Sequence, residues 1–399
     1  MRALEGIRIL DLTQMLAGPY GSLILADLGA EVIKIEPPEG DKKRTLGGEA
    51  KVGHEDVGFY ALNRNKRGMV LDLKVPEARE VFYDLARVAD VVMDNFRPGV
   101  MDRLGIGYAA LSRLDSRIIT CSVSGYGATG PMRDYPSYDL VVQALAGPMS
   151  MTGEPGRPPV RMGLPVADLA GGIFAAHGIM AALLARERTG RGQRVDIGLL
   201  DGLVSMLVYF TSRYFAEGRS EEPVGSGHPS LVPYQAFRAR DRYFVVAVPT
   251  NRFWELLCRA IGLERLIDDP RFRTNDDRAA HRAELVPLLA ETFAEKDAAH
   301  WVGLLRSEGI PTAPVNDLEG ALHEPQVRAR NMVIFQDHPT GARIAMSGNP
   351  IKLSDTPGET FTLAPLLGQH TEVILSEVLG YAPERIRALE AAGAIRVGH

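Results

Sequence analysis

Asp168 is the residue whose surroundings best suit nucleophilic chemistry. It opens the stretch DLAGGIFAAHGIMAALLARE (residues 168–187), which we expect to form a long helix that stops at Thr189-Gly190. As an N-cap, its carboxylate would accept the free N–H groups of the first turn, and this structural role alone explains an Asp here. The same N–H groups and the helix dipole would also keep the carboxylate ionised and nucleophilic. Small residues beside it would leave room for an acyl substrate and expose backbone donors to an oxyanion: Ala170, Gly171, Gly172, Ala175 and Ala176.

Basic residues gather in two segments, NRNKRGMVLDLK (residues 63–74) and NFRPGVMDRLG (residues 95–105). The whole chain is acidic, with a formal net charge of −5 and a pI near 6.0, so a local excess of cations suits a ligand with several phosphates. Coenzyme A, with a diphosphate and a 3′-phosphate, is such a ligand, and Phe96 could offer its adenine an aromatic face. An ordinary solvated surface is the alternative. The cations are Arg64, Lys66, Arg67, Lys74, Arg97 and Arg103, against the anions Asp72 and Asp102.

Other kinds of catalytic site lack their motifs. The chain has no G-x-S-x-G, H-E-x-x-H, P-loop or cysteine cluster, which argues against acyl-serine chemistry, zinc hydrolysis and NTP hydrolysis. We therefore expect no metal and no permanently bound cofactor. With 45% hydrophobic and 24% charged residues in 399, the chain is typical of a globular protein, and its acidity argues against nucleic-acid or membrane partners. The N-terminus lacks a signal-peptide pattern, so we expect a cytoplasmic protein.

Alternating strands and helices in the first 130 residues predict a Rossmann-like α/β layer with a parallel sheet. Residues 7–12 (IRILDL) read as a buried strand, a helical stretch extends to Asp27, and a second strand covers Val32–Ile35. The other expected elements of this layer are a helix over Pro76–Val88 and strands at Val91–Met93 and Ile118–Val123.

The first turn of this layer differs from that of a nicotinamide-dependent enzyme. Glu36 ends the second strand where a ribose-binding acid would sit, but the turn reads L-A-G-P-Y-G rather than G-x-G-x-x-G. The sequence therefore favours Rossmann-like layering without that cofactor.

The polar stretch GRSEEPVGSGHPS (residues 218–230) is the best candidate for a linker. It follows a long helix expected over about 200–216 and precedes a hairpin over Ala236–Val248 with its turn at Asp241-Arg242. His228 in this stretch could reach a cleft, although an ordinary loop histidine is the favoured interpretation. Helices expected around 251–261, 281–294 and 297–308 complete a smaller α+β domain, so we divide the chain into 1–217, 218–325 and 326–399.

On five stretches the chain resembles the family III CoA-transferases, the CaiB/BaiF family. These are GIRILDLTQMLAGPYGSLILADLGAEVIKIEPP, NRNKRGMVLDLK, DNFRPGVMDRLGIGY, SGYGATGP and PVADLAGGIFAAHGIMAALLARERTGRGQRVDIGLLDG. The resemblance covers nearly the whole chain. It implies that the N-terminal α/β layer and the C-terminal segment make one large domain, beside a small domain near residues 225–325. It also implies that two ring-shaped chains interlock as a homodimer.

The resemblance further implies roles for particular residues. The family nucleophile is an Asp in a G-D or A-D step before a Gly/Ala-rich helix, which matches Ala167-Asp168. The family's CoA-contacting positions recover part of the basic patch and add uncharged residues. They fall on Gln14, Ala17, Leu71, Lys74, Asn95, Phe96, Arg97, Arg103, Leu104 and Tyr138.

Departures from the family's patterns favour one branch. The racemase branch has a His before the Asp of a G-H-D step, where this chain has Ser137-Tyr138-Asp139, so a transferase is favoured over an acyl-CoA racemase or isomerase. The Gly-rich loop of the oxalate/formyl branch has no counterpart. The segment GHPSLVPYQAF and the ending PLLGQHTEVILSEVLGY instead resemble the branch that uses succinyl-CoA and dicarboxylates such as hydroxymethylglutarate or itaconate.

The resulting hypothesis is an enzyme that moves coenzyme A from an acyl-CoA to a free carboxylic acid through an aspartyl-CoA thioester on Asp168. The resemblance implies succinyl-CoA as donor and a dicarboxylate as acceptor. The alternatives are a racemase that transfers protons at Cα and a non-catalytic acyl-CoA-binding protein. The last is disfavoured because Asp168 and its small neighbours occur together with the phosphate-binding positions.

Overall fold

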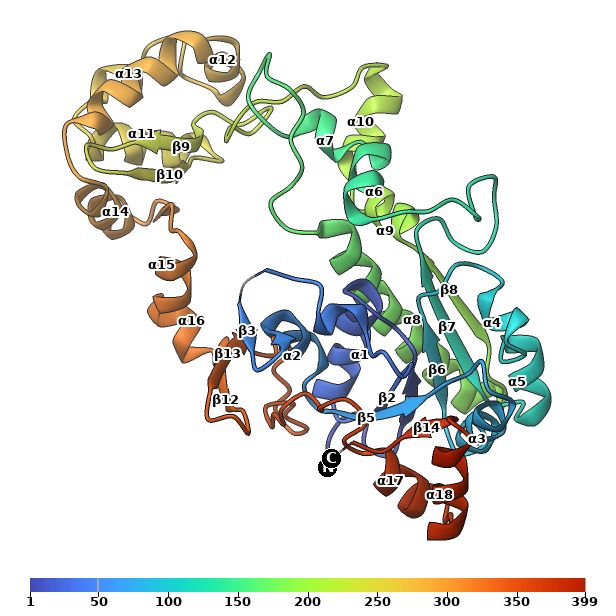
Figure 1. Cartoon of the computed structure of the whole chain (residues 1–399). Coiled ribbons are helices and arrows are strands. Elements are labelled where there is room, and N and C mark those ends of the chain that lie inside the picture. Colours follow the sequence, from blue (N-terminus) through green and yellow to red (C-terminus); the bar gives the residue numbers. More distant parts are fainter. Residues whose placement is uncertain (49, 399) are drawn as a thin grey trace. The chain divides into compact units, whose positions relative to one another are not determined.

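The computed structural model describes residues 1–48 and 50–398, and its contacts divide the chain into two compact units. The larger unit consists of Met1–Gly147, Met162–Val208 and Pro325–His399, and the smaller unit consists of Pro148–Arg161 and Tyr209–Glu324. Figure 1 labels the elements of each unit.

A seven-stranded sheet forms the centre of the larger unit, in the order β14-β5-β2-β1-β6-β7-β8. Six strands are parallel, and β14 at the edge is antiparallel to β5. Counted along the chain, the parallel strands lie in the order 3-2-1-4-5-6 of a doubly wound Rossmann-type sheet, so the predicted mostly parallel α/β fold is confirmed. The strands are β1 (Arg8–Asp11), β2 (Glu31–Glu36), β5 (Lys66–Leu71), β6 (Val91–Asp94), β7 (Ile119–Ser124), β8 (Arg194–Gly198) and β14 (Ile395–Arg396).

Two parallel strands, β5 and β8, were not predicted. β5 is buried along most of its length, but it begins with the charged pair Lys66-Arg67, so it does not show the apolar run that predicts a buried strand. β8 lies at the sheet edge and leaves Arg194 and Asp196 exposed, so it has no apolar run. Both strands pair with strands that are distant in the sequence, and a local sequence pattern does not reveal such pairing.

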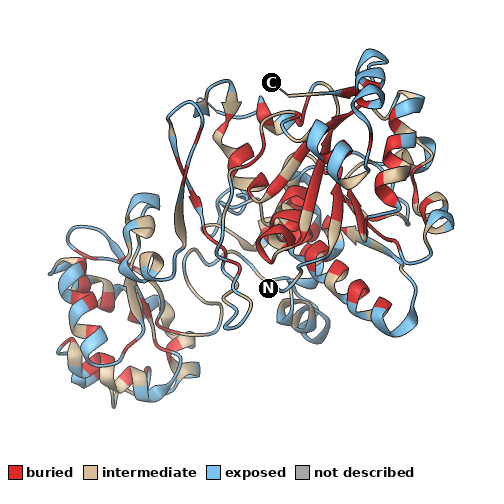
Figure 2. Ribbon diagram, turned by 90° about the horizontal axis from the view of Figure 1, so that it is seen from below, coloured by how far each residue is buried: buried red, intermediate tan, exposed pale blue. Residues whose placement is uncertain are grey.

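Helices cover both faces of this sheet, as Figure 1 shows. Neighbouring residues of a strand point to opposite faces. Ile9 accordingly packs in the core that α8 covers, and Leu10 in the core that α3 and α5 cover. Figure 2 shows the buried residues concentrated on the strands and on the helix surfaces that face them. The helices that cover the sheet are α1 (Ala17–Asp27), α3 (Pro76–Ala86), α5 (Tyr108–Leu114) and α8 (Val166–Thr189).

Shorter elements surround this core. They are the 3₁₀ turn η1 (Lys42–Arg44), β3 (Lys51–Val52), β4 (Glu55–Asp56), α2 (Val57–Asn63), α4 (Val100–Arg103), α6 (Asp139–Ala146) and α9 (Leu199–Ser205).

Helix α8 contains an 18-residue window that is long and apolar enough to cross a membrane, by length and composition only. Half of that window is buried within the protein. Its Ala175 and Ile179 pack against the sheet with no exposed surface, so in the larger unit it is a core helix.

The last segment of the chain joins the larger unit through many contacts with its N-terminal part. Ile395 of β14 pairs with Leu71 of β5, and the Tyr60 hydroxyl lies 2.9 Å from His338 Nε2. The elements of this segment are α16 (Pro325–Ala329), β12 (Val333–Asp337), β13 (Arg343–Ser347), α17 (Thr371–Val373), the π-helical turn η3 (Ile374–Val378), α18 (Pro383–Ala391) and β14.

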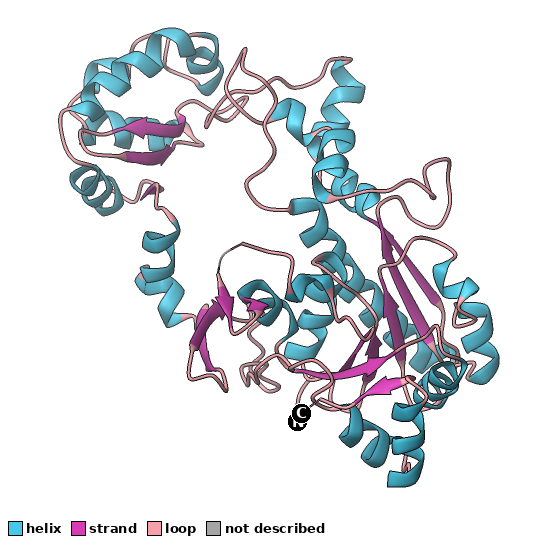
Figure 3. Ribbon diagram, viewed as in Figure 1, coloured by secondary structure: helices cyan, strands magenta, loops and turns pink. Residues whose placement is uncertain are grey.

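The smaller unit packs helices against a three-stranded sheet, β11-β10-β9, and matches the predicted α+β composition (Figure 3). Trp254, Phe293 and Leu305 are among the residues that fill its core. Its elements are α7 (Pro148–Met151), α10 (Tyr209–Glu217), β9 (Tyr234–Arg238), β10 (Tyr243–Ala247), α11 (Asn251–Ala260), η2 (Glu264–Leu266), α12 (Asn275–Ala280), α13 (Arg282–Ala294), α14 (Ala298–Ser307), β11 (Thr312–Pro314) and α15 (Leu318–His323).

The helix expected over 200–216 is two helices, α9 and α10. Val208 between them has a positive φ of 44°, and the boundary between the units falls directly after it. The apolar pattern LVSMLVYF continues across this break without Gly or Pro, so the sequence contains no local signal for the end of a helix. Residues 148–161 also belong to the smaller unit, where Gly225 donates a hydrogen bond to the Gly153 carbonyl at 2.9 Å.

Candidate active site

The carboxyl ends of the parallel strands border a cavity of about 700 Å³ in the larger unit. Ligands of doubly wound folds bind at this edge, where the strand order reverses, which here is between β1 and β6. Six predicted site residues line the cavity: Gln14, Ala17, Asn95, Phe96, Tyr138 and Asp168. The other lining residues are Met15, Leu16, Lys42, Lys43, Leu46, Gly58, Ala61, Leu62, Val123, Ser124, Gly125, Ser137 and Leu199.

Gln14 and Asn95 join the two loops at the reversal point. The Gln14 backbone N–H donates to Asn95 Oδ1 at 2.9 Å, and Asn95 Nδ2 donates to the Gln14 carbonyl at 2.7 Å. The loop after β1 is thereby fixed against the loop after β6, and both loops form part of the cavity wall.

Asp168 lies in the first turn of α8, but it does not cap the helix as predicted. The helix begins at Val166 after Pro165, which makes no side-chain cap. Asp139 supplies the missing acceptor, because its Oδ1 accepts the backbone N–H of Ala167 at 2.9 Å and that of Asp168 at 3.4 Å. The Asp168 side chain is therefore left to face the cavity.

The electrostatics of Asp168 also differ from the prediction. Burial, with the added negative charge of Asp139, raises the pKa of the Asp168 carboxyl to about 6. Within residues 1–48 and 50–398, no hydrogen bond to this carboxylate is recorded, so helix N–H groups do not hold it ionised as expected. A carboxylate with this pKa is still mostly ionised at pH 7 and is poorly solvated, which favours nucleophilic attack.

Gly172, one of the small residues after Asp168, has a packing role that was not predicted. A Cβ added to Gly172 would lie 2.6 Å from the Ala17 carbonyl oxygen, and one added to Gly21 would lie 2.8 Å from the Gly172 carbonyl oxygen. Helices α1 and α8 thus cross with their backbones in contact. This crossing places the first turn of α8, with Asp168, beside the cavity residue Ala17.

Three cations of the predicted basic patch form structural ion pairs, and the burial of Arg64 and Lys66 contradicts their interpretation as phosphate ligands. Each is engaged by an acid of the same unit, and Lys66 is completely buried. The pairs are Arg64 with Asp27 at 2.6 Å, Lys66 with Asp11 at 3.0 Å and Arg67 with Glu31 at 2.8 Å.

Five predicted CoA-contacting residues do not line this cavity, and four of them, Leu71, Lys74, Arg103 and Leu104, also do not line the second cavity, which contains Arg97. Leu71 is 2% exposed within β5, and the half-buried Leu104 packs against the same core. The side chain of Leu71 is therefore not available to a ligand. Lys74, after β5, and Arg103, at the end of α4, are exposed to solvent.

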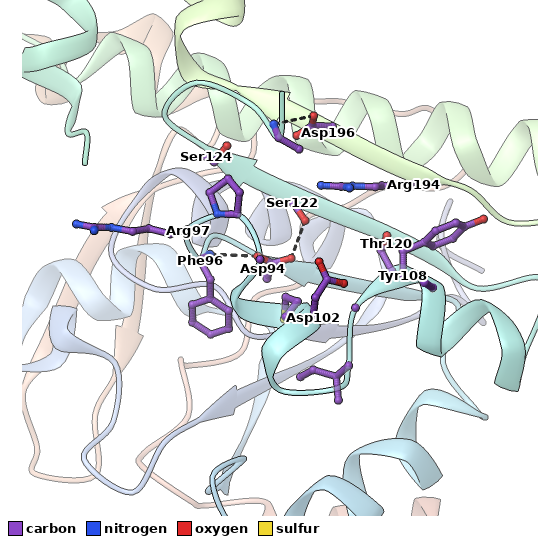
Figure 4. Close-up of a pocket in the computed structure, with 17 residues that line it drawn as sticks. Asp94, Phe96, Arg97, Asp102, Tyr108, Thr120, Ser122, Ser124, Arg194 and Asp196 are labelled. Carbon is purple, nitrogen blue, oxygen red and sulfur yellow. Dashed lines mark hydrogen bonds between the residues drawn. The ribbon is translucent and has the colours of Figure 1, made fainter. Parts of the chain in front are cut away.

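Arg97 lines a second, smaller cavity of about 300 Å³, which is drawn in Figure 4. Asp94 lies in this cavity and accepts hydrogen bonds from Ser122 Oγ at 2.8 Å and from the Phe96 backbone N–H at 3.1 Å (Figure 4). Burial raises the pKa of Asp94 to about 6, although these hydrogen bonds oppose the shift. Phe96 borders both cavities and so connects the main cavity to the neighbourhood of Arg97.

Among the charged residues at the site, sequence reasoning missed Lys42, Lys43 and Asp139. The two lysines follow β2 in the segment GDKKR, and their position just after a parallel strand was an available signal. Asp139 caps a helix that begins 27 residues later in the chain, and no local pattern reveals such a pairing.

His228 organises a loop of the smaller unit. Its Nδ1 accepts the backbone N–H groups of Ser230 and Leu231, both at 3.1 Å, and its ring packs edge-on against Tyr234. In the described part of the chain, no cluster of three or more His, Cys, Asp or Glu residues is arranged to hold a metal ion.

Comparisons with known proteins identify the family of the chain. The family model described as CoA-transferase family III matches residues 4–371. The succinyl-CoA:glutarate CoA-transferase of Mus musculus is 40% identical over 396 residues, covering 99% of this chain and 91% of that protein. The acetyl-CoA:oxalate CoA-transferase of Acetobacter aceti is 42% identical over 359 residues, covering 89% of this chain and 90% of that protein.

A solved structure gives the same result. The crystal structure of a CaiB/BaiF family protein from Brucella suis matches with a TM-score of 0.84 at 35% identity, covering 95% of this chain and 100% of that one. The chain therefore belongs to the family III CoA-transferases, and it is an enzyme that transfers coenzyme A between carboxylic acids.

Proposed function

We propose that this enzyme transfers coenzyme A from succinyl-CoA to a dicarboxylic acid through an aspartyl-CoA thioester on Asp168. The observation that carries the proposal is that Asp168 is the one carboxylate lining the main cavity in the described part of the chain. The relatives from mouse and Acetobacter each have a dicarboxylic acid, glutarate or oxalate, in their names, which supports the substrate class.

The reaction needs four acyl transfers and no net proton. The Asp168 carboxylate attacks the thioester carbonyl and expels CoA thiolate, which leaves an acyl-aspartyl anhydride. The thiolate then attacks the aspartyl carbonyl, forms the aspartyl-CoA thioester and releases the donor acid. The acceptor carboxylate attacks this thioester and again expels CoA thiolate. Attack of the thiolate on the acceptor's acyl carbon gives the new acyl-CoA and restores Asp168.

We further propose that CoA binds along the loops after β1, β6 and β7. Gln14, Ala17, Asn95 and Tyr138 would contact it in the main cavity, where they lie together with Asp168. A ligand that passes over Phe96 would reach Arg97, and the exposed Lys74 and Arg103 would provide further phosphate contacts. This path explains how residues outside the main cavity can still take part in binding.

Racemisation at Cα is the less favoured alternative. It needs acid and base groups that titrate near neutral pH on both sides of the carbon, and histidine commonly provides them. The lining of the main cavity in the described part of the chain contains no histidine, and Tyr138 stands where the racemase branch has one. A 2-methylacyl-CoA incubated in D₂O should therefore gain no Cα deuterium. Rapid deuteration without exchange between acids would move this enzyme to the racemase reaction.

Intact-mass measurement after mixing with succinyl-CoA tests the covalent step. The wild type should gain covalently bound CoA and release succinate, whereas Asp168→Asn should bind CoA without forming the adduct. Asp276→Asn in α12, an exposed carboxylate of the smaller unit, is the matched control and should form the adduct normally. A CoA adduct on Asp168→Asn that has not deamidated would contradict the role of Asp168.

We also propose that the chain forms a homodimer. Apolar side chains are exposed on α6, α8 and α9, more than a monomer's scattered surface residues require. Light scattering should give about twice the chain mass of 43.5 kDa, and a monomeric mass would contradict the proposal. The exposed apolar residues on these three helices are Leu140, Val141, Leu145, Ile173, Leu184 and Val204.

A further inference from the structure

Three basic residues follow one another in the turn η1, Lys42-Lys43-Arg44, and acids of the described part of the chain neutralise Lys43 and Arg44. Lys43 Nζ lies 2.9 Å from Asp56 Oδ1. Arg44 is buried between Glu36 at 2.7 Å and Glu55 at 2.6 Å. Lys42 is exposed, and no ion pair of its Nζ is recorded in residues 1–48 and 50–398.

The backbone that carries Lys42 is firmly held. Asp41 forms a fully buried ion pair with Lys34 at 2.9 Å. Its Oδ1 also accepts the backbone N–H of Met15 at 3.1 Å and that of Lys43 at 2.9 Å. The turn is thereby joined to the loop after β1, so the position of Lys42 relative to the cavity wall is fixed by buried polar contacts.

Lys42 and Asp168 line the same cavity, and a dicarboxylic acid needs a cation there. The substrate's first carboxylate or thioester must approach Asp168, and Asp139 adds a second negative charge behind it. A second substrate carboxylate would meet mostly uncharged lining residues unless a cation received it. In the described part of the chain, the cations that line the cavity are Lys42 and Lys43, and Asp56 already neutralises Lys43.

We propose that Lys42 binds the non-reacting carboxylate of the dicarboxylic substrate while the reacting end lies at Asp168. This inference rests on the proposed function and specifies it, because it makes Lys42 the residue that selects dicarboxylic over monocarboxylic acids. An ammonium group on a flexible stem suits this role, since acids of different chain length would place the second carboxylate at different depths.

The test compares CoA transfer from glutaryl-CoA to succinate and to butyrate, two acceptors that differ by one carboxylate at equal chain length. Lys42→Met should raise KM for succinate about 10- to 100-fold, as expected for loss of a charge-assisted contact. KM for butyrate should change little, and Lys42→Arg should restore part of the selectivity. Lys51→Met, which removes an exposed lysine outside the cavity on nearby β3, is the matched control and should behave as wild type.

Calorimetric titration with free coenzyme A separates this role from a phosphate contact. Lys42→Met should bind free coenzyme A with unchanged affinity. Weaker binding of coenzyme A, with an unchanged ratio of succinate to butyrate activity, would show that Lys42 binds a phosphate and would overturn the inference. A wild type that uses butyrate as readily as succinate would overturn the dicarboxylate proposal and, with it, the role of Lys42.

Discussion

The reacting carboxylate and its helix cap are different residues, and they influence each other. Asp139 satisfies the N–H groups at the start of α8, which leaves Asp168 without the hydrogen bonds that lower a carboxyl pKa. Burial and the charge of Asp139 then raise the pKa of Asp168 to about 6. A raised pKa means a more basic carboxylate, and therefore a better nucleophile at neutral pH than an ordinary solvated Asp.

This pKa predicts the pH dependence of the covalent half-reaction. Only the ionised form of Asp168 attacks, so adduct formation with succinyl-CoA should fall as the pH drops through about 6 and level off above 7. Asp139→Asn removes the second cause of the shift and keeps an acceptor oxygen for the cap. The midpoint should therefore move to lower pH, while the larger effect of burial remains. Rapid-quench mass measurements between pH 4.5 and 8 would show a flat profile if Asp168 were not the titrating group.

The same pKa predicts an unusual stability effect for Asp168→Asn. A carboxyl whose pKa is raised from 3.8 to about 6 on folding destabilises the folded state once it ionises, so this cost is absent below about pH 4 and complete above 6. The inactive Asn variant should therefore be more stable than wild type at pH 8, by about 1–2 kcal/mol after allowing for partial exposure. Denaturant unfolding at pH 4.5 and pH 8 measures the difference. A variant less stable than wild type at pH 8 would contradict this environment for Asp168.

At the scale of elements, the contact between α1 and α8 positions the nucleophile. Gly21 and Gly172 bring the two backbones together, and Ala17 and Asp168 lie at the cavity ends of the two helices. An apolar helix such as α8 could pack on the sheet in several registers. The glycine contact selects one of them, because a Cβ at either position would clash with backbone that cannot move away.

Gly172→Ala should therefore destabilise the protein by about 1–3 kcal/mol and lower kcat/KM, even though Ala is the better helix former. The added Cβ would lie 2.6 Å from the Ala17 carbonyl oxygen and push the two helices apart. Gly303→Ala in α14 is the matched control, because nothing lies within 4 Å of its added Cβ. It should stabilise by up to about 1 kcal/mol. Thermal unfolding and steady-state kinetics should be measured for both variants. Equal changes in stability and in kcat/KM for Gly172→Ala and Gly303→Ala would contradict the close contact between α1 and α8.

At the scale of the whole molecule, several basic side chains of the larger unit form buried ion pairs and do not face solvent. Lys66 of β5 donates to Asp11 of β1 at 3.0 Å, to Ser22 of α1 at 2.8 Å and to Asn63 of α2 at 2.9 Å. Burial alone would raise the pKa of Asp11, but Lys66 and Lys34 lower it to about 2. This network ties four elements together below the cavity, and it leaves few cations for ligands.

Lys66→Met should consequently act on folding and not on coenzyme A affinity. Removing one partner leaves Asp11 charged and buried, which should cost about 3–5 kcal/mol of unfolding free energy. The folded fraction should bind CoA normally.

Arg103→Ala should leave the unfolding free energy unchanged and weaken CoA binding. The loss of CoA affinity should be larger at low salt than at high salt, since phosphate contacts are screened by ions. Unfolding curves and calorimetric titrations at two salt concentrations compare the two variants, and a salt-dependent loss of CoA affinity in Lys66→Met would contradict the structural assignment.

The sequence by itself determined the α/β class, the position of α8 and the candidate nucleophile. Apolar runs such as IRILDL specify buried strands, and the long Ala-rich stretch after Asp168 specifies a helix, because both signals come from neighbouring residues. Short motifs also carried the resemblance to CoA-transferases, which the comparisons confirm. The resemblance implied that Gln14, Ala17, Asn95, Phe96 and Tyr138 contact CoA, and these five residues line one cavity.

Tertiary structure alone decided which charged residues are free to act. Nothing local distinguishes Lys66 from Lys42, yet the first is buried against Asp11 and the second lines the cavity. The cap of α8 likewise comes from Asp139, so the pKa of Asp168 could not be inferred from its own helix. Burial and ion pairing depend on contacts between segments that are distant in the sequence. Only the folded chain brings those segments together.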